Sequence, residues 1–213
     1  MADELVFYTS PMSRGRIARW MLEEVGQPYR TVFLDFATTA KTPEYLALNP
    51  MGKVPTLVHG KTVVTEAAAV CAYLADAFPE AGLAPEPAQR GAYYRWMFFA
   101  AGPVEAAITN RALAVEVPRE REVLVGYGSY ERVMDTLEAA VGGGGYVAGD
   151  AFSAADVYFG SAIGWGLRFG TIEDRPAFTA YWQRIADRPA AVRARALDDA
   201  AMPAKVPAGE AQA

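Results

Sequence analysis

The alternation of strand-like and helix-like segments at the start of the chain constrains the fold most strongly. Residues 5–9 form a short run of apolar, β-prone side chains, residues 14–25 carry apolar side chains at helical spacing, and residues 29–34 are again strand-like. A strand, a helix and a second strand in this order favour a parallel βαβ unit with a right-handed crossover. The sequence therefore predicts that the chain begins as an α/β fold.

A second group of short elements follows this unit. Residues 56–58 and 62–64 are brief strand-like runs, and the turn chemistry of residues 59–61 predicts a tight hairpin between them. Residues 66–78 then form an apolar, alanine-rich helical stretch. The predicted order of elements is βαβ, a loop, and ββα.

The rest of the chain is helical in character, and no strand-like run is found beyond residue 90. Residues 91–110 and 119–141 are long helical candidates, the second of which is weakened by Gly126 and Gly128. Residues 152–157 have the pattern of a capping box with a hydrophobic staple, which predicts the start of a further helix.

These patterns predict two domains of different class. We expect an α/β N-terminal domain over residues 1–80, a linker over residues 81–90 in which two prolines interrupt any periodicity, and an all-α domain over residues 91–213. In the helical domain, Ser153 is expected to cap a helix while Asp156 bonds back toward the cap.

Composition narrows the classes of function. The chain of 213 residues has a net charge of −5 and no block of lysine and arginine, so we expect neither nucleic acid nor an anionic membrane surface as a partner. A local cluster of Arg14, Arg16 and Arg19 could still attract a small anion. The single cysteine, Cys71, and the single histidine exclude an internal disulfide and leave too few soft ligands for a zinc site, so no metal is expected.

The sequence also bears on the cellular compartment. It has no charged-then-apolar leader and no apolar run of the ~18 residues that a membrane helix needs. We therefore expect no membrane association and a cytoplasmic location.

Three stretches of the N-terminal third carry a family resemblance. They are residues 8–14, which read Tyr-Thr-Ser-Pro-Met-Ser-Arg, residues 49–57, which read Asn-Pro-Met-Gly-Lys-Val-Pro-Thr-Leu, and residues 65–74, which read Thr-Glu-Ala-Ala-Ala-Val-Cys-Ala-Tyr-Leu. Together with the helix start at residues 152–156, they resemble the cytosolic glutathione S-transferase family, in particular its bacterial, serine-type members. The resemblance implies a thioredoxin-like N-terminal domain, glutathione as co-substrate, detoxification chemistry and a homodimer.

The middle stretch predicts a place for an extended peptide. A cis bond between Val54 and Pro55 is energetically accessible, and it would turn the N–H and C=O of Val54 outward. A ligand peptide could then pair with them as an added strand. The resemblance implies that Lys41 and Lys53 hold the glycine carboxylate of glutathione, and lysine is a suitable point charge for that purpose.

Glu66 is expected in the first turn of its helix, with Thr65 as the cap. A helix N-terminus attracts a carboxylate, and the resemblance implies that this one binds the γ-glutamyl carboxylate while Glu66 holds the α-amino group. The family usually has serine at the next position, where this chain has Ala67. Losing a hydrogen bond to a charged group costs ~1.5–3 kcal/mol, so the substitution bears directly on glutathione affinity.

Two hydroxyl groups compete as activators of the glutathione sulfur. The resemblance implies a serine that stabilises the thiolate, and both Ser13, beside the first helix, and Ser10, near the strand end, fit this role. Tyr8 is expected to face the core, because it lies inside the strand. Cys71 is expected to be a buried small hydrophobe, which disfavours a cysteine-type enzyme.

The function that follows is transfer of the glutathione thiolate to a small hydrophobic electrophile. Tyr94, Phe98 and Trp165 are aromatic candidates for the wall of the electrophile pocket between the domains. A glutathione-dependent peroxidase or isomerase would use the same thiolate. Ala67 also leaves open a non-catalytic dimerising or ligand-binding module.

Overall fold

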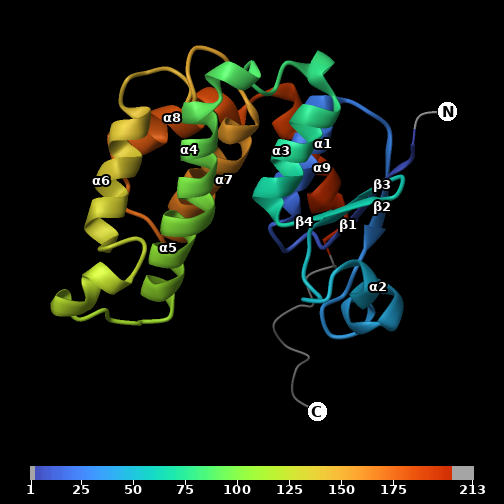
Figure 1. Cartoon of the computed structure of the whole chain (residues 1–213), viewed down its shortest axis with the longest axis horizontal. Helices are drawn as coiled ribbons and strands as arrows, with labels where there is room; N and C mark the ends of the chain where they lie inside the picture. The colour runs from blue at the N-terminus through green and yellow to red at the C-terminus, as the bar shows by residue number, and fades with distance from the viewer. Residues whose placement is uncertain (1–2, 203–213) are drawn as a thin grey trace.

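The computed structural model describes residues 3–202, which form a sheet-containing part and a helical part lying side by side (Figure 1). The first part has the predicted βαβ-ββα order. Its elements are β1 (Leu5–Thr9), α1 (Gly15–Val25), β2 (Tyr29–Phe33), the short α2 (Pro43–Leu48), β3 (Thr56–His59), β4 (Thr62–Thr65) and α3 (Ala67–Ala77).

The four strands form one mixed sheet in the order β2-β1-β3-β4. β1 and β2 are parallel, as the predicted crossover requires, whereas β3 runs antiparallel to both β1 and β4. The hairpin is slightly longer than expected, since His59 and Thr65 extend its strands and Gly60, at φ 58°, supplies the positive backbone angle of the turn.

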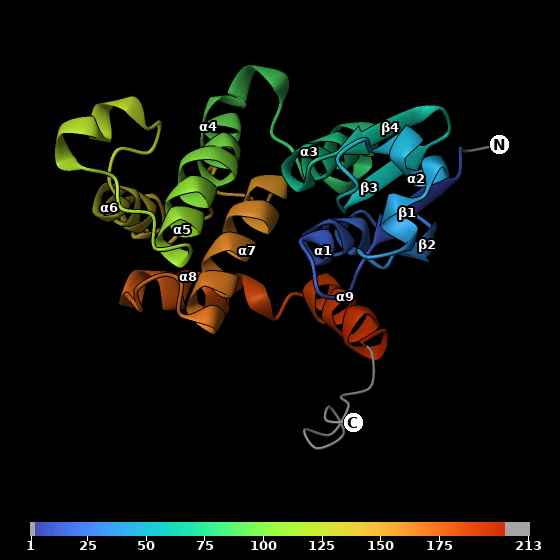
Figure 2. The same ribbon diagram turned by 90° about the horizontal axis from the view of Figure 1, so that it is seen from below.

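Helices α1 and α3 bury the sheet on the side of the helical part (Figure 2). The apolar stripe predicted for α1 is buried, with Ile17, Met21 and Leu22 at 5% exposure or less, because these positions recur on one helix face. Gly26, at φ 74°, ends the helix in the left-handed conformation. The thioredoxin-like N-terminal fold is therefore confirmed.

The described residues beyond the sheet contain helices and no named strand, which confirms the all-helical character of this part. Its α-helices are α4 (Gly91–Phe99), α5 (Glu105–Ala112), α6 (Tyr130–Val141), α7 (Ala154–Phe169), α8 (Pro176–Ala186) and α9 (Pro189–Ala200). Residues 203–213 of the predicted helical domain lie outside the described residues.

Both long helical predictions are wrong in detail. The helix predicted over residues 91–110 contains a π-helical turn, Ala100–Val104, because Pro103 has no N–H to donate within the helix. The helix predicted over residues 119–141 is split into a 3₁₀ segment, Arg119–Leu124, and α6. The break includes Gly128 at φ 68°, a conformation that an α-helix does not accept.

The predicted start of α7 is confirmed. Ser153 is its N-cap, and the Asp156 carboxylate accepts from the Ser153 N–H at 2.9 Å. Asp156 is fully buried and α7 is largely enclosed by its neighbours, so the cap stands at the centre of the helical part.

The last described helix, α9, returns to the sheet-containing part. It packs against α1, and Arg19 on α1 forms a buried ion pair with Asp198 on α9 at 2.8 Å. Figure 2 shows α9 beside α1. The C-terminal helix therefore fixes the two parts of the chain against each other. Among residues 3–202, none of the helices combines the length and apolar character needed to cross a membrane.

Candidate functional site

The sheet register brings the predicted site residues to one edge. Tyr8 of β1 lies opposite Thr56 of β3, and Thr56 lies opposite Thr65 of β4. The loop after β1, the Val54–Pro55 step before β3 and Glu66 after β4 therefore leave the sheet at the same end. Segments that are distant in the sequence thus meet at one place.

The loop after β1 holds both candidate serines. Ser13 is half-buried, and its Oγ accepts from the Gly15 N–H at 2.9 Å while donating to the Ser10 carbonyl at 2.6 Å. It thus satisfies a backbone donor at the start of α1, although the formal N-cap is Arg14. Ser10 is 8% exposed, so the more accessible hydroxyl of the two belongs to Ser13.

Gly15 is required by the close packing of this loop. A Cβ at this position would lie 1.9 Å from Thr9 Oγ1 and 2.9 Å from Ser13 Oγ. Thr9 is fully buried and β-branched, so it cannot turn away without strain.

We expect Gly15→Ala to lower the free energy of unfolding by about 1–3 kcal/mol, the usual cost of overpacking. Urea denaturation measures the effect. Gly91→Ala, at the start of α4, is the matched control, because a Cβ there meets nothing within 4 Å. Equal stability of the two variants would contradict this account of the loop.

The Val54–Pro55 bond is cis, as the sequence interpretation expected. Among the hydrogen bonds of residues 3–202, none uses the N–H or C=O of Val54. The preceding loop is held by Asn49, whose Nδ2 donates to the Lys53 carbonyl at 2.9 Å and whose Oδ1 accepts from the Met51 N–H at 3.1 Å. A fixed loop therefore presents an unpaired backbone edge.

Lys41 and Lys53 are both exposed, and neither forms an ion pair within the described residues. Lys41 lies against the loop that contains Lys53, because a Cβ on Gly52 would be 3.0 Å from the Lys41 Nζ. Gly52 also has a φ of 58°, so both the backbone conformation and the close approach of Lys41 favour glycine there. The two cations stand at one side of the edge formed by Val54.

The prediction for the start of α3 is wrong in one respect. Glu66 is itself the N-cap, at φ 66° and ψ 119°, and Thr65 ends the preceding strand. The Glu66 C=O accepts from the Val70 N–H. The N–H groups of Ala67, Ala68 and Ala69 have no partner among residues 3–202. The chain reverses so sharply after β4 that the helix begins one residue later than expected. The exposed Glu66 side chain and the open helix N-terminus lie together.

A groove of about 320 Å³ opens beside Ser13. One wall is the loop after β1 and the start of α1, and the other is the end of α7 with Met202. Its lining includes the residues Met12, Ser13, Arg14, Arg16, Trp165, Arg168 and Phe169. Ser10 is not among the lining residues. The wall contributed by α7 was missed in the sequence apart from Trp165.

An apolar cavity of about 130 Å³ adjoins this groove, and both are lined by Arg14, Trp165 and Phe169. Burial raises the pKa of Tyr158, in the wall of this cavity, to about 12, so its phenol is neutral at physiological pH. Tyr94 and Phe98 line neither space. Trp165 is therefore the one aromatic candidate of the three that the fold brings beside Ser13.

The remaining candidates take structural positions. Cys71 is fully buried, as expected, and burial raises the pKa of its thiol, which excludes it as a ready nucleophile. Tyr8 is half-buried and packs on Tyr45, with ring centroids 5.5 Å apart, so its expected burial in the core is only partial. Within residues 3–202 no group of His, Cys, Asp and Glu side chains is arranged to hold a metal ion.

The arginine cluster noted in the sequence is divided by the fold. Arg14 and Arg16 line the groove, where Arg14 pairs with Glu105 of α5 and Arg16 with Asp199 of α9, at 2.7 Å for the latter. Arg19 is instead buried against Asp198. The Arg14–Glu105 pair also ties the loop of Ser13 to the helical part.

Comparison with known families agrees with this geometry. Residues 4–76 match the model of the glutathione S-transferase N-terminal domain, and residues 99–189 match that of the C-terminal domain. Glutathione S-transferase 3 of Zea mays is 32% identical over 204 residues, which cover 87% of this chain and 90% of the maize protein. The chain belongs to the glutathione S-transferase family. The predicted enzyme class and its co-substrate, glutathione, are thereby confirmed, and the peroxidase, isomerase and non-catalytic alternatives are not favoured.

Bacterial relatives extend the comparison. Glutathione S-transferase GST-4.5 of Xanthomonas campestris pv. campestris is 29% identical over 90% of this chain and 98% of its own length. Among solved structures, a sphingomonad glutathione S-transferase complexed with glutathione has a TM-score of 0.71 at 29% identity, covering 91% of this chain and 98% of its own. A glutathione transferase of Methylococcus capsulatus strain Bath has a TM-score of 0.75 at 27% identity, covering 92% and 99%.

Proposed function

We propose that this glutathione transferase binds glutathione along the edge formed by Val54, Glu66 and the loop of Ser13. The observation that carries the proposal is the convergence there of an unpaired backbone, an open helix N-terminus and an accessible hydroxyl. An extended peptide pairs with the Val54 N–H and C=O as an added strand. Such pairing fixes the cysteine residue of glutathione at the centre of the site.

The two ends of the tripeptide meet opposite charges in this arrangement. The γ-glutamyl carboxylate accepts hydrogen bonds from the N–H groups at the start of α3, including that of Ala67. The α-amino group pairs with the Glu66 carboxylate. The glycine carboxylate takes Lys41 and Lys53, which have no other ionic partner among residues 3–202. Complementary charges at both ends fix the direction of the peptide.

Ser13 is the proposed activator of sulfur, because it lines the groove and Ser10 does not. On binding, its O–H turns from the Ser10 carbonyl to the sulfur and stabilises the thiolate. The thiolate forms a C–S bond to the electrophilic carbon. With an aryl chloride, chloride leaves with the electron pair of the broken C–Cl bond, and the thiol proton goes to solvent.

The test of the function is conjugation of glutathione to 1-chloro-2,4-dinitrobenzene by the purified chain, together with retention on immobilised glutathione. Binding without conjugation would favour a ligand-binding module. Conjugation at the uncatalysed rate, with no retention, would refute the proposal.

We expect Ser13→Ala to raise the pKa of the bound thiol by about one unit, since one hydroxyl donor to the thiolate is lost. At pH values below the pKa of the bound thiol, Ser13→Ala should lower kcat/KM about tenfold. The difference from the wild type should narrow as the pH rises through that pKa, because the thiolate then forms without the hydroxyl. The pH profile of conjugation measures both. If Ser10→Ala shifts the profile and Ser13→Ala does not, the role belongs to Ser10.

The electrophile is proposed to be small and hydrophobic. The cavity of about 130 Å³ beside the groove is lined mainly by apolar side chains, among them Ala100, Val104, Ile108 and Trp165. Its position supports attack by a thiolate held at Ser13.

A homodimer is proposed from exposed apolar side chains in the loop before β3, on β4 and on α4; β4 and α4 lie along the same side of the molecule in Figure 2. Met51 is 69% exposed, Phe98 67%, Tyr94 42% and Val63 41%. Large apolar side chains that are left exposed are typical of an association surface.

The division into domains over residues 1–80, 81–90 and 91–213 remains our proposal. The long helical part and the separate sheet support it, although α9 packs on the N-terminal part. We also propose a cytoplasmic location, which the single, fully buried cysteine supports because the fold uses no disulfide.

A further inference from the structure

The charge of the groove beside Ser13 goes beyond what a purely hydrophobic electrophile requires. Three arginines, Arg14, Arg16 and Arg168, line it, and no aspartate or glutamate does. The chain as a whole is acidic, with a net charge of −5. A local excess of cations in an acidic protein therefore marks this groove as a place for anions.

The three arginines differ in how they are compensated. Arg14 pairs with Glu105, and Arg16 pairs with Asp199. Arg168, in the last turn of α7, forms no ion pair within residues 3–202, and its guanidinium carbon lies 5.6 Å from the centre of the Phe169 ring. Arg168 is thus the uncompensated charge of the groove.

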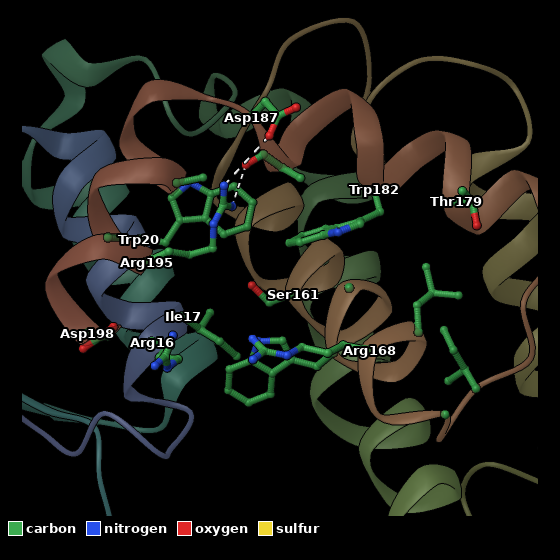
Figure 3. A pocket seen from close by; sticks show the side chains of 18 of the residues that line it. Arg16, Ile17, Trp20, Ser161, Arg168, Thr179, Trp182, Asp187, Arg195 and Asp198 are labelled. Atoms are coloured by element: carbon green, nitrogen blue, oxygen red, sulfur yellow. Dashed lines mark hydrogen bonds and ion pairs between the residues drawn. The ribbon is translucent and has the colours of Figure 1, made fainter. Parts of the chain in front are cut away.

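Arg168 also stands at the boundary of a larger cavity of about 770 Å³ between α1, α7, α8 and α9 (Figure 3). Figure 3 shows Arg168 and Arg16 on opposite sides of this cavity, on α7 and α1. The carboxylates that line it have other partners. Asp174 accepts from Thr179 at 2.8 Å, and Asp198 pairs with Arg19 at 2.8 Å. Asp187 is 3.9 Å from Arg195. Arg168 therefore keeps its charge available to the groove.

We propose that Arg168 selects electrophiles that combine an aromatic or apolar body with a carboxylate or another anionic group. This inference rests on the proposed function of the groove. The apolar body lies against Trp165 and Phe169, and the anionic group pairs with Arg168. The electrophile is then held on the α7 wall, across the groove from Ser13.

The need for such a cation follows from the chemistry of the reaction. The thiolate is an anion, and a second anion entering the same groove is repelled by it. Arg14 and Arg16 stand on the wall that carries Ser13, whereas Arg168 stands on the facing wall. Arg168, the arginine of the groove that pairs with no carboxylate among residues 3–202, offsets this repulsion and lets the two anions approach. A neutral electrophile gains nothing from Arg168.

The test compares two electrophiles with the same reacting ring, 4-chloro-3,5-dinitrobenzoate and its neutral methyl ester. Rates of conjugation are corrected for the uncatalysed reaction, and the readout is the ratio of kcat/KM for the acid to that for the ester. We expect Arg168→Gln to lower this ratio about tenfold, equivalent to ~1.4 kcal/mol. Arg168→Lys should keep most of the wild-type ratio, since it retains a point charge.

Two controls make the result specific. Arg132→Gln removes the same charge from an exposed position on α6 whose side chain makes no hydrogen bond or ion pair among residues 3–202, and it should leave the ratio as in the wild type. Added salt should lower the wild-type ratio toward that of Arg168→Gln by screening. An unchanged ratio in Arg168→Gln would overturn the inference while leaving the transferase intact. Failure of the wild type to conjugate either compound would overturn the proposed function itself.

Discussion

Replacing Asp156 by alanine should lower the free energy of unfolding by about 3–5 kcal/mol, because several buried donors then lose their only partner. Oδ1 of Asp156 accepts from the Val147 N–H at 2.8 Å and from the Tyr181 O–H at 2.7 Å. Oδ2 accepts from the Ser153 N–H at 2.9 Å and from its Oγ at 3.0 Å. Asp156 and Tyr181 have no exposed surface, so water cannot replace these bonds.

The effect extends beyond one helix turn. The Asp156 carboxylate joins the start of α7 to Val147, in the preceding loop, and to Tyr181 on α8. Burial raises the pKa of this carboxyl, and the four hydrogen bonds act in the opposite direction. The charge is therefore tolerated because donors surround it.

Urea denaturation followed by circular dichroism measures the loss. Tyr181→Phe, which removes a single hydrogen bond at constant shape, should cost only about 1 kcal/mol. Asp156→Asn keeps the side-chain volume but turns an amide N–H₂ toward donors. Its stability should therefore be closer to that of Asp156→Ala than to that of the wild type. If Asp156→Ala lowered the free energy of unfolding by less than Tyr181→Phe does, the four hydrogen bonds would not act together.

Local patterns in the sequence predicted the elements that depend on local interactions. The apolar stripe of α1 and the Ser153–Asp156 cap are properties of a few neighbouring residues, and both are found where expected. The interruptions were harder to place. Pro103 lies inside a helical pattern without ending it, because the chain forms a π-helical turn around this residue, which has no N–H to donate.

The site divides in the same way. Val54 and Glu66 stay predicted site residues; motifs pointed to them on two segments that the sheet register brings to one edge. Apart from Trp165, the facing wall was not predicted, because Arg168 and Met202 are brought beside Ser13 only by the packing of α7 and α9 on α1. Arg19 was grouped with Arg16 in the sequence, yet its partner, Asp198, is 179 positions away and cannot be inferred from spacing.

Replacing Glu66 by glycine should separate stability from function. Glu66 has a φ of 66° and a ψ of 119°, a backbone conformation that costs a side-chain-bearing residue about 1–3 kcal/mol. Glycine adopts it freely but gains entropy in the unfolded chain, so we expect the variant to be as stable as the wild type or up to ~1 kcal/mol more stable. Glutathione affinity should fall about 10- to 100-fold, the equivalent of a lost hydrogen bond between charged groups.

Ala114→Gly is the matched control for this prediction. Ala114 is the other non-glycine residue with positive φ among the described residues, at 53°, and it lies outside the site. It should relieve backbone strain to a similar degree without changing glutathione affinity. Calorimetric titration with glutathione and urea denaturation measure the two quantities on the same samples.

Glu66→Gln completes the comparison, because it keeps the side-chain length and the strained backbone while removing the charge. If the α-amino group of glutathione pairs with the Glu66 carboxylate, Glu66→Gln should lose most of the glutathione affinity that Glu66→Gly loses. It should not show the gain in stability expected for Glu66→Gly. Ala67 sharpens the expected difference, since it brings no hydroxyl to the start of α3 that could compensate. Wild-type affinity in both variants would mean that the strained residue serves the reversal after β4 alone, and that the γ-glutamyl end is held elsewhere.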